Sequence, residues 1–308
     1  MTAVVLLAGN LQTPTRQYKG ELGKFYPIGT VGHMPGTGEK IENGSSRLVA
    51  IKGVRTALAF GTQKETYVAG EGRMLFLIDA AIKNAEKIPI LTGDSRSFSI
   101  RMFESGMKQG DFAYHTTVRP DMGPMKPKLQ YGESMDVVLV FEFPSPIAKV
   151  RLSPYYSKSF GTDPNFDLTD KVGKSASVFA RDSLTFARTA TVSKGKKFDL
   201  DALEFVVKGV EKTADKGYKV VVDVSNPMPL AVKWGWQYAK ATVKSAQGTE
   251  TAYYPDFKVT SAGTWQGEVP PGKTVTGEYT FYPADGAAPT SFALQMNSTK
   301  RAVTVTGL

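Results

Sequence analysis

The chain has 308 residues and a formal net charge of +9, from 38 Lys and Arg against 29 Asp and Glu. Its hydrophobic content of 41% is enough to build packed cores, and its length favours about two domains of ~100–200 residues each. It contains no cysteine and two histidines, His33 and His115, which excludes disulfides, thiolate metal sites, cysteine nucleophiles and any mechanism that needs three imidazoles from one chain.

The positive charge favours a polyanionic partner. Basic residues alternate with acids and never form a run of five or six, so the sequence holds no dedicated nucleic-acid motif. We therefore expect the partner to be an envelope protein or an anionic envelope polymer, and a homo-oligomer is compatible with the sequence.

Residues 3–8 (AVVLLA) form an apolar run near the N-terminus. The run is far shorter than the roughly 20 residues of a membrane helix, so no transmembrane span is predicted. It resembles the end of a signal-peptide hydrophobic region, although the basic segment that should precede it is missing. Export to the periplasm, the cell envelope or the medium is the favoured interpretation, and a buried first strand is the alternative. Residues 10–47, rich in Gly, Pro and Thr, are expected to form a long irregular arm.

Most of the remaining chain is expected to form short strands rich in Val, Phe and Tyr and bounded by Gly, Pro, Asn or Asp. Clear examples are residues 97–103, 135–143, 218–224 and 274–282. Residues 78–87 have a helix-forming composition, but they run into Ile88-Pro89-Ile90, so we interpret them as the end of a strand. Many short strands at this turn density are typical of β-sandwiches or barrels.

Four weak sequence matches recur in the same order in both halves of the chain. They pair 52–54 (KGV) with 208–210 (KGV), 82–84 (IKN) with 224–226 (VSN), 129–132 (LQYG) with 269–272 (VPPG), and 150–152 (VRL) with 292–294 (FAL). Phe141 and Phe281 follow the glycines of the third pair at the same offset. Matches in register predict a duplicated module.

This pattern of a strand ending in Asn, a Gly turn, a long strand ending in Phe and a closing strand resembles a family of small bacterial extracytoplasmic immunoglobulin-like domains of largely unassigned function. The resemblance implies an all-β fold of two tandem immunoglobulin-like β-sandwich domains preceded by the long irregular N-terminal arm. The expected segments are residues 1–47 for the possible signal remnant and basic arm, 48–200 for the first sandwich with its linker, and 201–308 for the second sandwich. The resemblance transfers no catalytic residue.

Copper is the first metal to consider, because imidazole and thioether ligands suit it better than Zn²⁺ or Mg²⁺. If the arm folds back on the first sandwich, a site could form from His33, Met34, His115, Met122 and Met125. The alternative is that the methionines fill irregular parts of the core. A superoxide-dismutase-like copper enzyme would normally need more imidazoles than this chain has.

Calcium is the second metal to consider, because Asp163, Asn165, Asp167 and Asp170 place oxygen ligands at the alternate positions that open a calcium loop. Leu168 stands where the loop glycine belongs and Lys174 where the bidentate Glu belongs, which excludes an EF-hand. A looser calcium site in the linker is one interpretation, and a turn rich in Asp and Asn is the other.

The alternating rings of Trp234, Trp236 and Tyr238 should share one face of a strand. On the surface they would form a platform for sugar rings, whereas on the inner face they belong to the core, which is the favoured interpretation. Phosphate-binding glycine motifs, a nucleophile elbow and H-E-x-x-H are all absent from the sequence.

The sequence thus favours a non-enzymatic cell-envelope binding or scaffold protein, with no catalytic residue and no certain cofactor. The alternatives are a copper-binding envelope protein, with superoxide-dismutase-type activity if it is an enzyme, and a polysaccharide-binding module.

Overall fold

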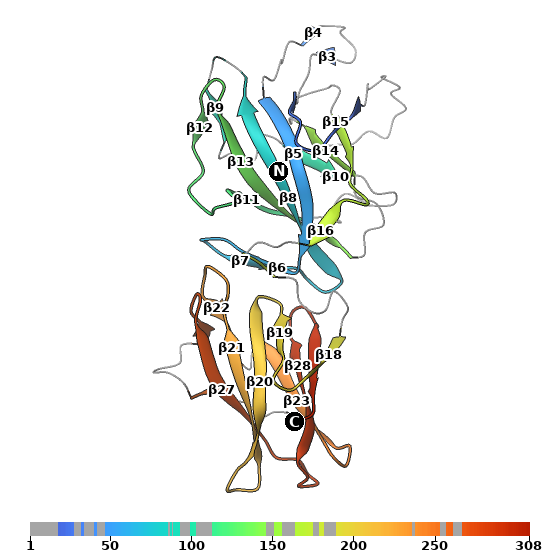
Figure 1. Cartoon of the computed structure of the whole chain (residues 1–308), viewed down its shortest axis with the longest axis vertical. Coiled ribbons are helices and arrows are strands. Elements are labelled where there is room, and N and C mark those ends of the chain that lie inside the picture. Colours follow the sequence, from blue (N-terminus) through green and yellow to red (C-terminus); the bar gives the residue numbers. More distant parts are fainter. Residues whose placement is uncertain are drawn as a thin grey trace, which may run out of the picture.

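The structure, a computed structural model, describes residues 18–27, 32–33, 40–41, 47–85, 87, 89–92, 99–102, 113–145, 151–155, 164–174, 179–181, 189–235, 238–252, 257–260 and 267–308. Every regular element in this part of the chain is a strand, which confirms the all-β fold. The strands form two β-sandwiches stacked along the long axis of the molecule (Figure 1). Within the described ranges, no helix is long and apolar enough to cross a membrane.

The first sandwich packs a long sheet against a shorter one. The long sheet has the order β11 (Ala113–Val118), β13 (Ser134–Pro144), β8 (Arg73–Asn84), β5 (Arg47–Ala57) and β16 (Val172–Lys174), with β2 (Tyr26–Pro27) also paired to β5. The shorter sheet has the order β1 (Tyr18–Lys19), β15 (Pro164–Asp167), β14 (Arg151–Tyr155) and β10 (Ser99–Met102). Two small pairs join β9 (Ile90–Leu91) to β12 (Lys128–Leu129) and β3 (Gly32–His33) to β4 (Lys40–Ile41). One core cluster spans both sheets, because Phe76 and Phe143 of the long sheet pack in it with Leu152 and Phe166 of the short one.

The second sandwich repeats this plan with two five-stranded sheets. One sheet has the order β19 (Lys197–Leu200), β20 (Leu203–Lys212), β21 (Tyr218–Ser225), β27 (Thr274–Phe281) and β25 (Lys258–Val259). The other has the order β18 (Thr189–Ser193), β29 (Ala302–Thr306), β28 (Pro289–Met296), β23 (Ala239–Ser245) and β24 (Glu250–Ala252), and β22 (Val232–Lys233) pairs with β26 (Glu268–Val269). Strict alternation of buried and half-buried residues along β21 delivers Val220, Val222 and Val224 to the core, as a strand period of two requires.

The matched sequence segments occupy equivalent places in the two sandwiches. The pairing of β5 with β8 shifts register between Ile51 and Gly53, and that of β20 with β21 shifts between Val207 and Gly209, so each KGV segment marks a β-bulge. The matched asparagines are equivalent too, as Asn84 donates through Nδ2 to the carbonyl of Leu129 at 2.9 Å and Asn226 to that of Val269 at 2.8 Å.

The turns before β13 and β27 are also equivalent. The Gly132 amide donates to the Asn84 carbonyl and the Gly272 amide to the Asn226 carbonyl, both at 2.8 Å. Both glycines have a positive φ, 78° and 64°, which explains why the sequence has glycine there.

Strands also form in segments that the sequence assigned to the arm and the linker. β1 and β2 of the arm pair with β15 and β5. In the linker, β15 and β16 join the first sandwich, whereas β18 and β19 join the second by pairing with β29 and β20. The sheets of the second sandwich therefore begin at Thr189, before residue 201. Residues 78–83 lie in β8, as expected for the end of a strand.

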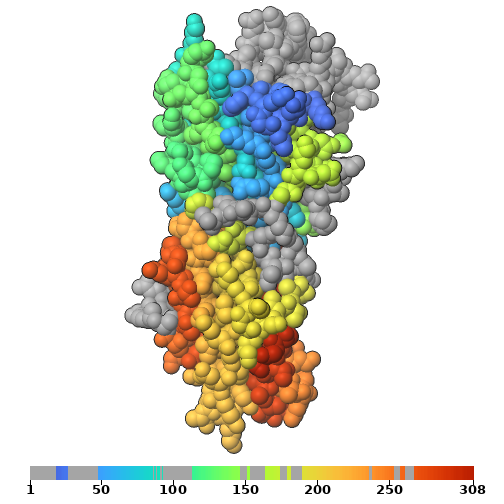
Figure 2. Space-filling view, viewed as in Figure 1, coloured from blue at the N-terminus to red at the C-terminus, as the bar shows by residue number. Residues whose placement is uncertain are grey.

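A small three-stranded sheet lies between the two sandwiches. It consists of β6 (Ala59–Gly61), β7 (Thr66–Val68) and β17 (Ala180–Arg181), and Figure 1 shows β6 and β7 at the boundary. Strands β6 and β7 belong to the connection from β5 to β8. In the second sandwich, β20 and β21 are the equivalents of β5 and β8, and only the short turn 213–217 joins them. The first module thus carries an insertion that faces the second, and the space-filling view shows the two modules in contact (Figure 2).

Candidate functional site at the interdomain junction

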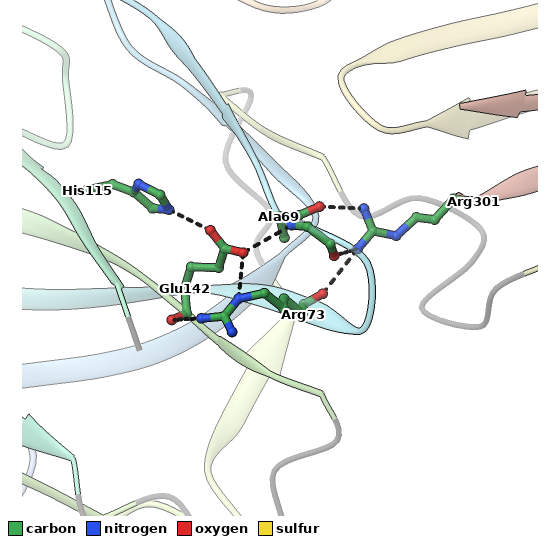
Figure 3. Close-up of polar contacts among 6 residues, drawn as sticks. Ala69, Arg73, His115, Glu142 and Arg301 are labelled. Atoms are coloured by element: carbon green, nitrogen blue, oxygen red, sulfur yellow. Dashed lines mark hydrogen bonds and ion pairs between the residues drawn. The ribbon is translucent and has the colours of Figure 1, made fainter. Parts of the chain in front are cut away.

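Arg301 is the central residue of the contact between the sandwiches. It lies just before β29 in the second sandwich and is only 5% exposed. Its Nη1 donates to the carbonyl of Ala69 at 3.0 Å, and its Nη2 to the carbonyls of Gly70 at 3.3 Å and Arg73 at 3.1 Å, in the turn after β7 and at the first residue of β8 (Figure 3). One guanidinium therefore ties the second sandwich to three backbone carbonyls of the first, a geometry that its planar fork of donors suits.

Asp201 is the counter-ion of Arg301. Its Oδ1 lies 3.2 Å from Arg301 Nη1, and its Oδ2 accepts from the hydroxyl of Thr299 at 2.8 Å. Asp201 is 2% exposed and has a φ of 54°, a left-handed conformation that Asp tolerates better than most residues. Burial raises the pKa of Asp201 above its ordinary value, against the opposing effects of Thr299 and Arg301. A buried charge in this state depends on its partner, so Asp201 and Arg301 form one unit.

Glu142 of β13 holds the same turn from the side of the first sandwich. Its Oε1 accepts from Arg73 Nε at 2.7 Å and from the Gly70 amide at 3.1 Å, and its Oε2 lies 2.9 Å from His115 Nε2 (Figure 3). Burial works to raise the pKa of Glu142, but the hydrogen bonds from Gly70 and His115 and the charge of Arg73 hold it below its ordinary value. Glu142 is therefore an anion that organises the turn.

A β-bulge brings His115 to Glu142. The pairing of β11 with β13 shifts register between Tyr114 and Thr116, which leaves His115 as the extra residue of the bulge. The imidazole packs against the ring of Tyr67 on β7, with centroids 4.9 Å apart and an interplanar angle of 31°. Burial, followed by a hydrogen bond to Glu65, raises the pKa of Tyr67 to about 12. The imidazole thus joins the edge of the first sandwich to the inserted strands.

Apolar packing completes the junction. Ala59 of the insertion forms a buried cluster with Ala202 and Met228 of the second sandwich. A Cβ atom added at Gly61 would lie 2.7 Å from Cδ of Pro229, so the close approach of the two modules requires glycine at this position. The junction therefore combines a buried ion pair with close apolar contact.

The expected copper ligands are distributed over different parts of the described fold. His115 contacts Glu142 and Tyr67, as described above. Met122 is 7% exposed in one core cluster, and the partly buried Met125 packs against another, as expected for methionines that fill the core. Met34 and the side chain of His33 lie outside the described residues. Among the described side chains, no three or more His, Asp or Glu groups converge to hold a metal ion.

The expected calcium ligands form a turn where the structure describes them. The Oδ1 of Asp167 accepts from the hydroxyl and the amide of Thr169, at 2.8 and 3.3 Å, and its Oδ2 lies 3.6 Å from Arg151 Nε. These contacts lower the pKa of Asp167, the Thr169 hydroxyl most of all. Asn165 lies in β15 and Asp170 in the turn after it, while Asp163 lies outside the described residues. The described oxygens thus fit the alternative of an Asp-rich turn.

Of the two interpretations of Trp234, Trp236 and Tyr238, the favoured one, a place in the core, holds for Trp234. Trp234 is 1% exposed and packs against Phe205 in the core of the second sandwich, with ring centroids 4.9 Å apart. Strand β22 ends at Lys233, before Trp234, and the Tyr238 amide donates to the Gly235 carbonyl. Trp236 lies outside the described residues.

A pocket of about 460 Å³ with a mixed polar and apolar lining lies on the first sandwich. Its lining consists of Arg119, Pro120, Asp121, Lys126, Ser134, Met135 and Asp136. The charged residues of the lining already form ion pairs. Arg119 pairs with Asp121 at 2.7 Å, Lys126 with Glu133 at 3.3 Å and Asp136 with Lys52 at 2.7 Å. The lining therefore presents a balanced set of charges to a ligand.

The sequence did not single out Arg301, Asp201 or Glu142. Charged residues are frequent in this chain, and nothing local distinguishes these three. A signal was nevertheless present in the spacing of the matched segments, because residues 58–72 of the first half correspond to the much shorter segment 213–217 of the second. An insertion confined to one copy of a repeat marks a place where that copy has an extra contact.

Comparison with known proteins gives a limited result. No family model matches the chain, and no curated protein matches it. Among solved structures, the chain is similar to an uncharacterized β-sandwich protein from Clostridium difficile 630, with 14% sequence identity and a TM-score of 0.32. The match covers 50% of this chain and 95% of that one.

Proposed function

We propose that the protein is a non-enzymatic scaffold or binding protein of the cell envelope, in which two immunoglobulin-like modules are held at a fixed mutual orientation. The observation that carries this proposal is the buried contact of Arg301 with Asp201 and three carbonyls of the first module. Two independent modules on a flexible linker would need no buried guanidinium hydrogen-bonded from one module to the backbone of the other. A fixed orientation would let one module bind a partner while the other is held at a defined distance.

The surface charge supports an anionic envelope polymer as the partner. The chain carries a net charge of +9 with its basic residues spread along the sequence, which suits many weak contacts with a polyanion. Such contacts are screened by salt, with a Debye length of ~10 Å at about 0.1 M. Binding should therefore depend strongly on ionic strength.

Co-sedimentation tests this proposal. The full chain is mixed with purified envelope fragments of its source cells at about 50 mM and about 500 mM salt, with an acidic protein of similar mass as the control. We expect the chain to pellet at low salt and to be released at high salt. If it stays in the supernatant at low salt, the proposed partner is wrong. Cell fractionation that finds the native chain away from the envelope would contradict the proposed location.

A further inference from the structure

Glu142 and Arg301 hold the turn 69–73 from two sides, and both do so through Gly70 and Arg73. Gly70 and Arg73 donate to Glu142 through an amide and a guanidinium, and they accept from Arg301 through their carbonyls. A carboxylate that keeps Gly70 and Arg73 in place also keeps the acceptors of Arg301 in place. Any change in how firmly Glu142 is held is therefore transmitted to the interdomain junction.

His115 is placed to make such a change. Its Nε2 lies 2.9 Å from Glu142 Oε2, and its side chain is 24% exposed, so protons reach it from solvent. A neutral imidazole can donate one hydrogen bond to the carboxylate. A protonated imidazole adds a positive charge to that bond, so a Coulomb attraction to the ionised carboxylate of Glu142 is added to the hydrogen bond.

We propose that His115 is a proton-sensing residue of the interdomain junction. When its imidazole gains a proton, Glu142 is fixed more firmly, the turn 69–73 is held in place, and Arg301 binds the first sandwich more tightly. This inference rests on the proposed function, because it concerns the regulation of the fixed orientation between the modules.

The ionisable groups that face the imidazole from the neighbouring strands keep their own charge state near neutral pH. Histidine is the side chain that changes charge between about pH 5 and 8. Glu142 on β13 has a lowered pKa and stays ionised in that range, and Tyr67 on β7, with a pKa of about 12, stays neutral. Arg73 on β8 remains a cation, and Glu65 contacts the Tyr67 hydroxyl beyond the ring.

Reciprocal linkage gives the first test. In a His33→Gln background His115 is the sole histidine, so its titration can be followed by NMR without overlap. If protonation of His115 tightens the Arg301 contact, then weakening that contact must lower the titration midpoint of His115. Arg301→Lys keeps the charge but loses the fork, and we expect it to lower the midpoint by about 0.5 pH unit, a roughly threefold change in proton affinity.

The sign of the shift is diagnostic in the Arg301→Ala variant. Loss of a nearby positive charge alone would raise the midpoint, whereas loss of the coupling lowers it. Lys208→Gln, which removes a cation paired with Asp223 at the surface of the second sandwich, is the control and should leave the midpoint unchanged. An unchanged or raised midpoint in both Arg301 variants would overturn the proposal.

Spin-label distances give the second test. The sequence lacks cysteine, so Lys128→Cys and Lys240→Cys, both at exposed positions, allow one label on each sandwich. We expect the distance distribution to be narrower at pH 5.5 than at pH 8, and this difference to vanish in His115→Gln, which keeps a donor but cannot titrate. A narrow distribution at both pH values would refute the sensing role alone. A broad distribution at both would refute the fixed orientation itself.

Discussion

Replacement of Arg301 by alanine leaves the carboxylate of Asp201, 2% exposed, with the Thr299 hydroxyl as its remaining described partner. Removal of one member of a buried ion pair costs about 3–5 kcal/mol, most of it from the uncompensated charge. With a urea m-value of ~2 kcal/mol/M, this loss lowers the unfolding midpoint by about 2 M.

Tryptophan fluorescence is a suitable probe for this variant. All three tryptophans, at positions 234, 236 and 265, belong to the second half of the chain, and Trp234 is in the core of the second sandwich. Urea unfolding monitored at these tryptophans therefore reports the module that contains Arg301. Lys300→Ala, the adjacent exposed cation, is the matched control and should change the free energy of unfolding by less than about 0.5 kcal/mol.

The double variant Asp201→Asn with Arg301→Ala separates the uncompensated charge from the lost hydrogen bonds. It removes the buried charge, so we expect it to be more stable than Arg301→Ala alone by about 1–3 kcal/mol. The reasoning is refuted if Arg301→Ala costs less than about 1 kcal/mol, or if the double variant is no more stable than the single one.

The pH dependence of the Arg301→Ala variant follows from Asp201. Burial raises the pKa of Asp201, so on acidification the folded protein takes up this proton before the unfolded chain does. Without Arg301 the pKa of Asp201 should rise further. The difference in the free energy of unfolding between the wild type and Arg301→Ala should therefore become smaller as the pH falls from 7 toward the ordinary pKa of Asp, 3.8.

Three further predictions concern other positions. Asn226→Ala removes three hydrogen bonds in the interior of the second sandwich and should cost about 2–3 kcal/mol in the same urea assay; a cost below about 1 kcal/mol would contradict the structural role of this repeated asparagine. Gly277→Ala places a methyl group in steric conflict with the ring of Phe257 and should lower the free energy of unfolding by about 1–3 kcal/mol. An unchanged urea midpoint would contradict this prediction. Glu142→Gln should lower the stability at pH 7, and this loss should disappear as the pH falls below the ordinary value of 4.5 and through the lowered pKa of Glu142, because a lowered folded-state pKa stabilises the fold only while the carboxylate is ionised. Thermal melts at pH 7 and about pH 3 measure the loss, and an equal loss at both pH values would contradict the prediction.

The sequence predicted a duplicated module from four weak matches, and the structure gives the physical reason why these positions match. The repeated KGV segments are bulges, and the repeated asparagines and turn glycines make equivalent hydrogen bonds in both sandwiches. Each of these features needs a particular residue type at one position. These positions therefore keep the same residue type in both halves even though the overall similarity of the two halves is weak.

The junction could not be predicted in the same way. Arg301 is 232 residues from Ala69, and all three of its acceptors in the first sandwich are backbone carbonyls. Every residue has a backbone carbonyl, so the sequence does not show which ones accept from Arg301. The aromatic alternation around Trp234 left a platform and a core position open, and Trp234 lies in the core, as the favoured interpretation had it. A period of two places rings on one face only while the strand continues, and here it ends at Lys233.

The fixed orientation of the two sandwiches is tested most directly by spin-label distances between Lys128→Cys and Lys240→Cys at pH 6, with and without Arg301→Ala. A narrow distribution with a single maximum is predicted for the chain with Arg301, and a clearly broader one for Arg301→Ala. Equally broad distributions in both proteins would show that the buried contact of Arg301 does not hold the modules together, and would contradict the account.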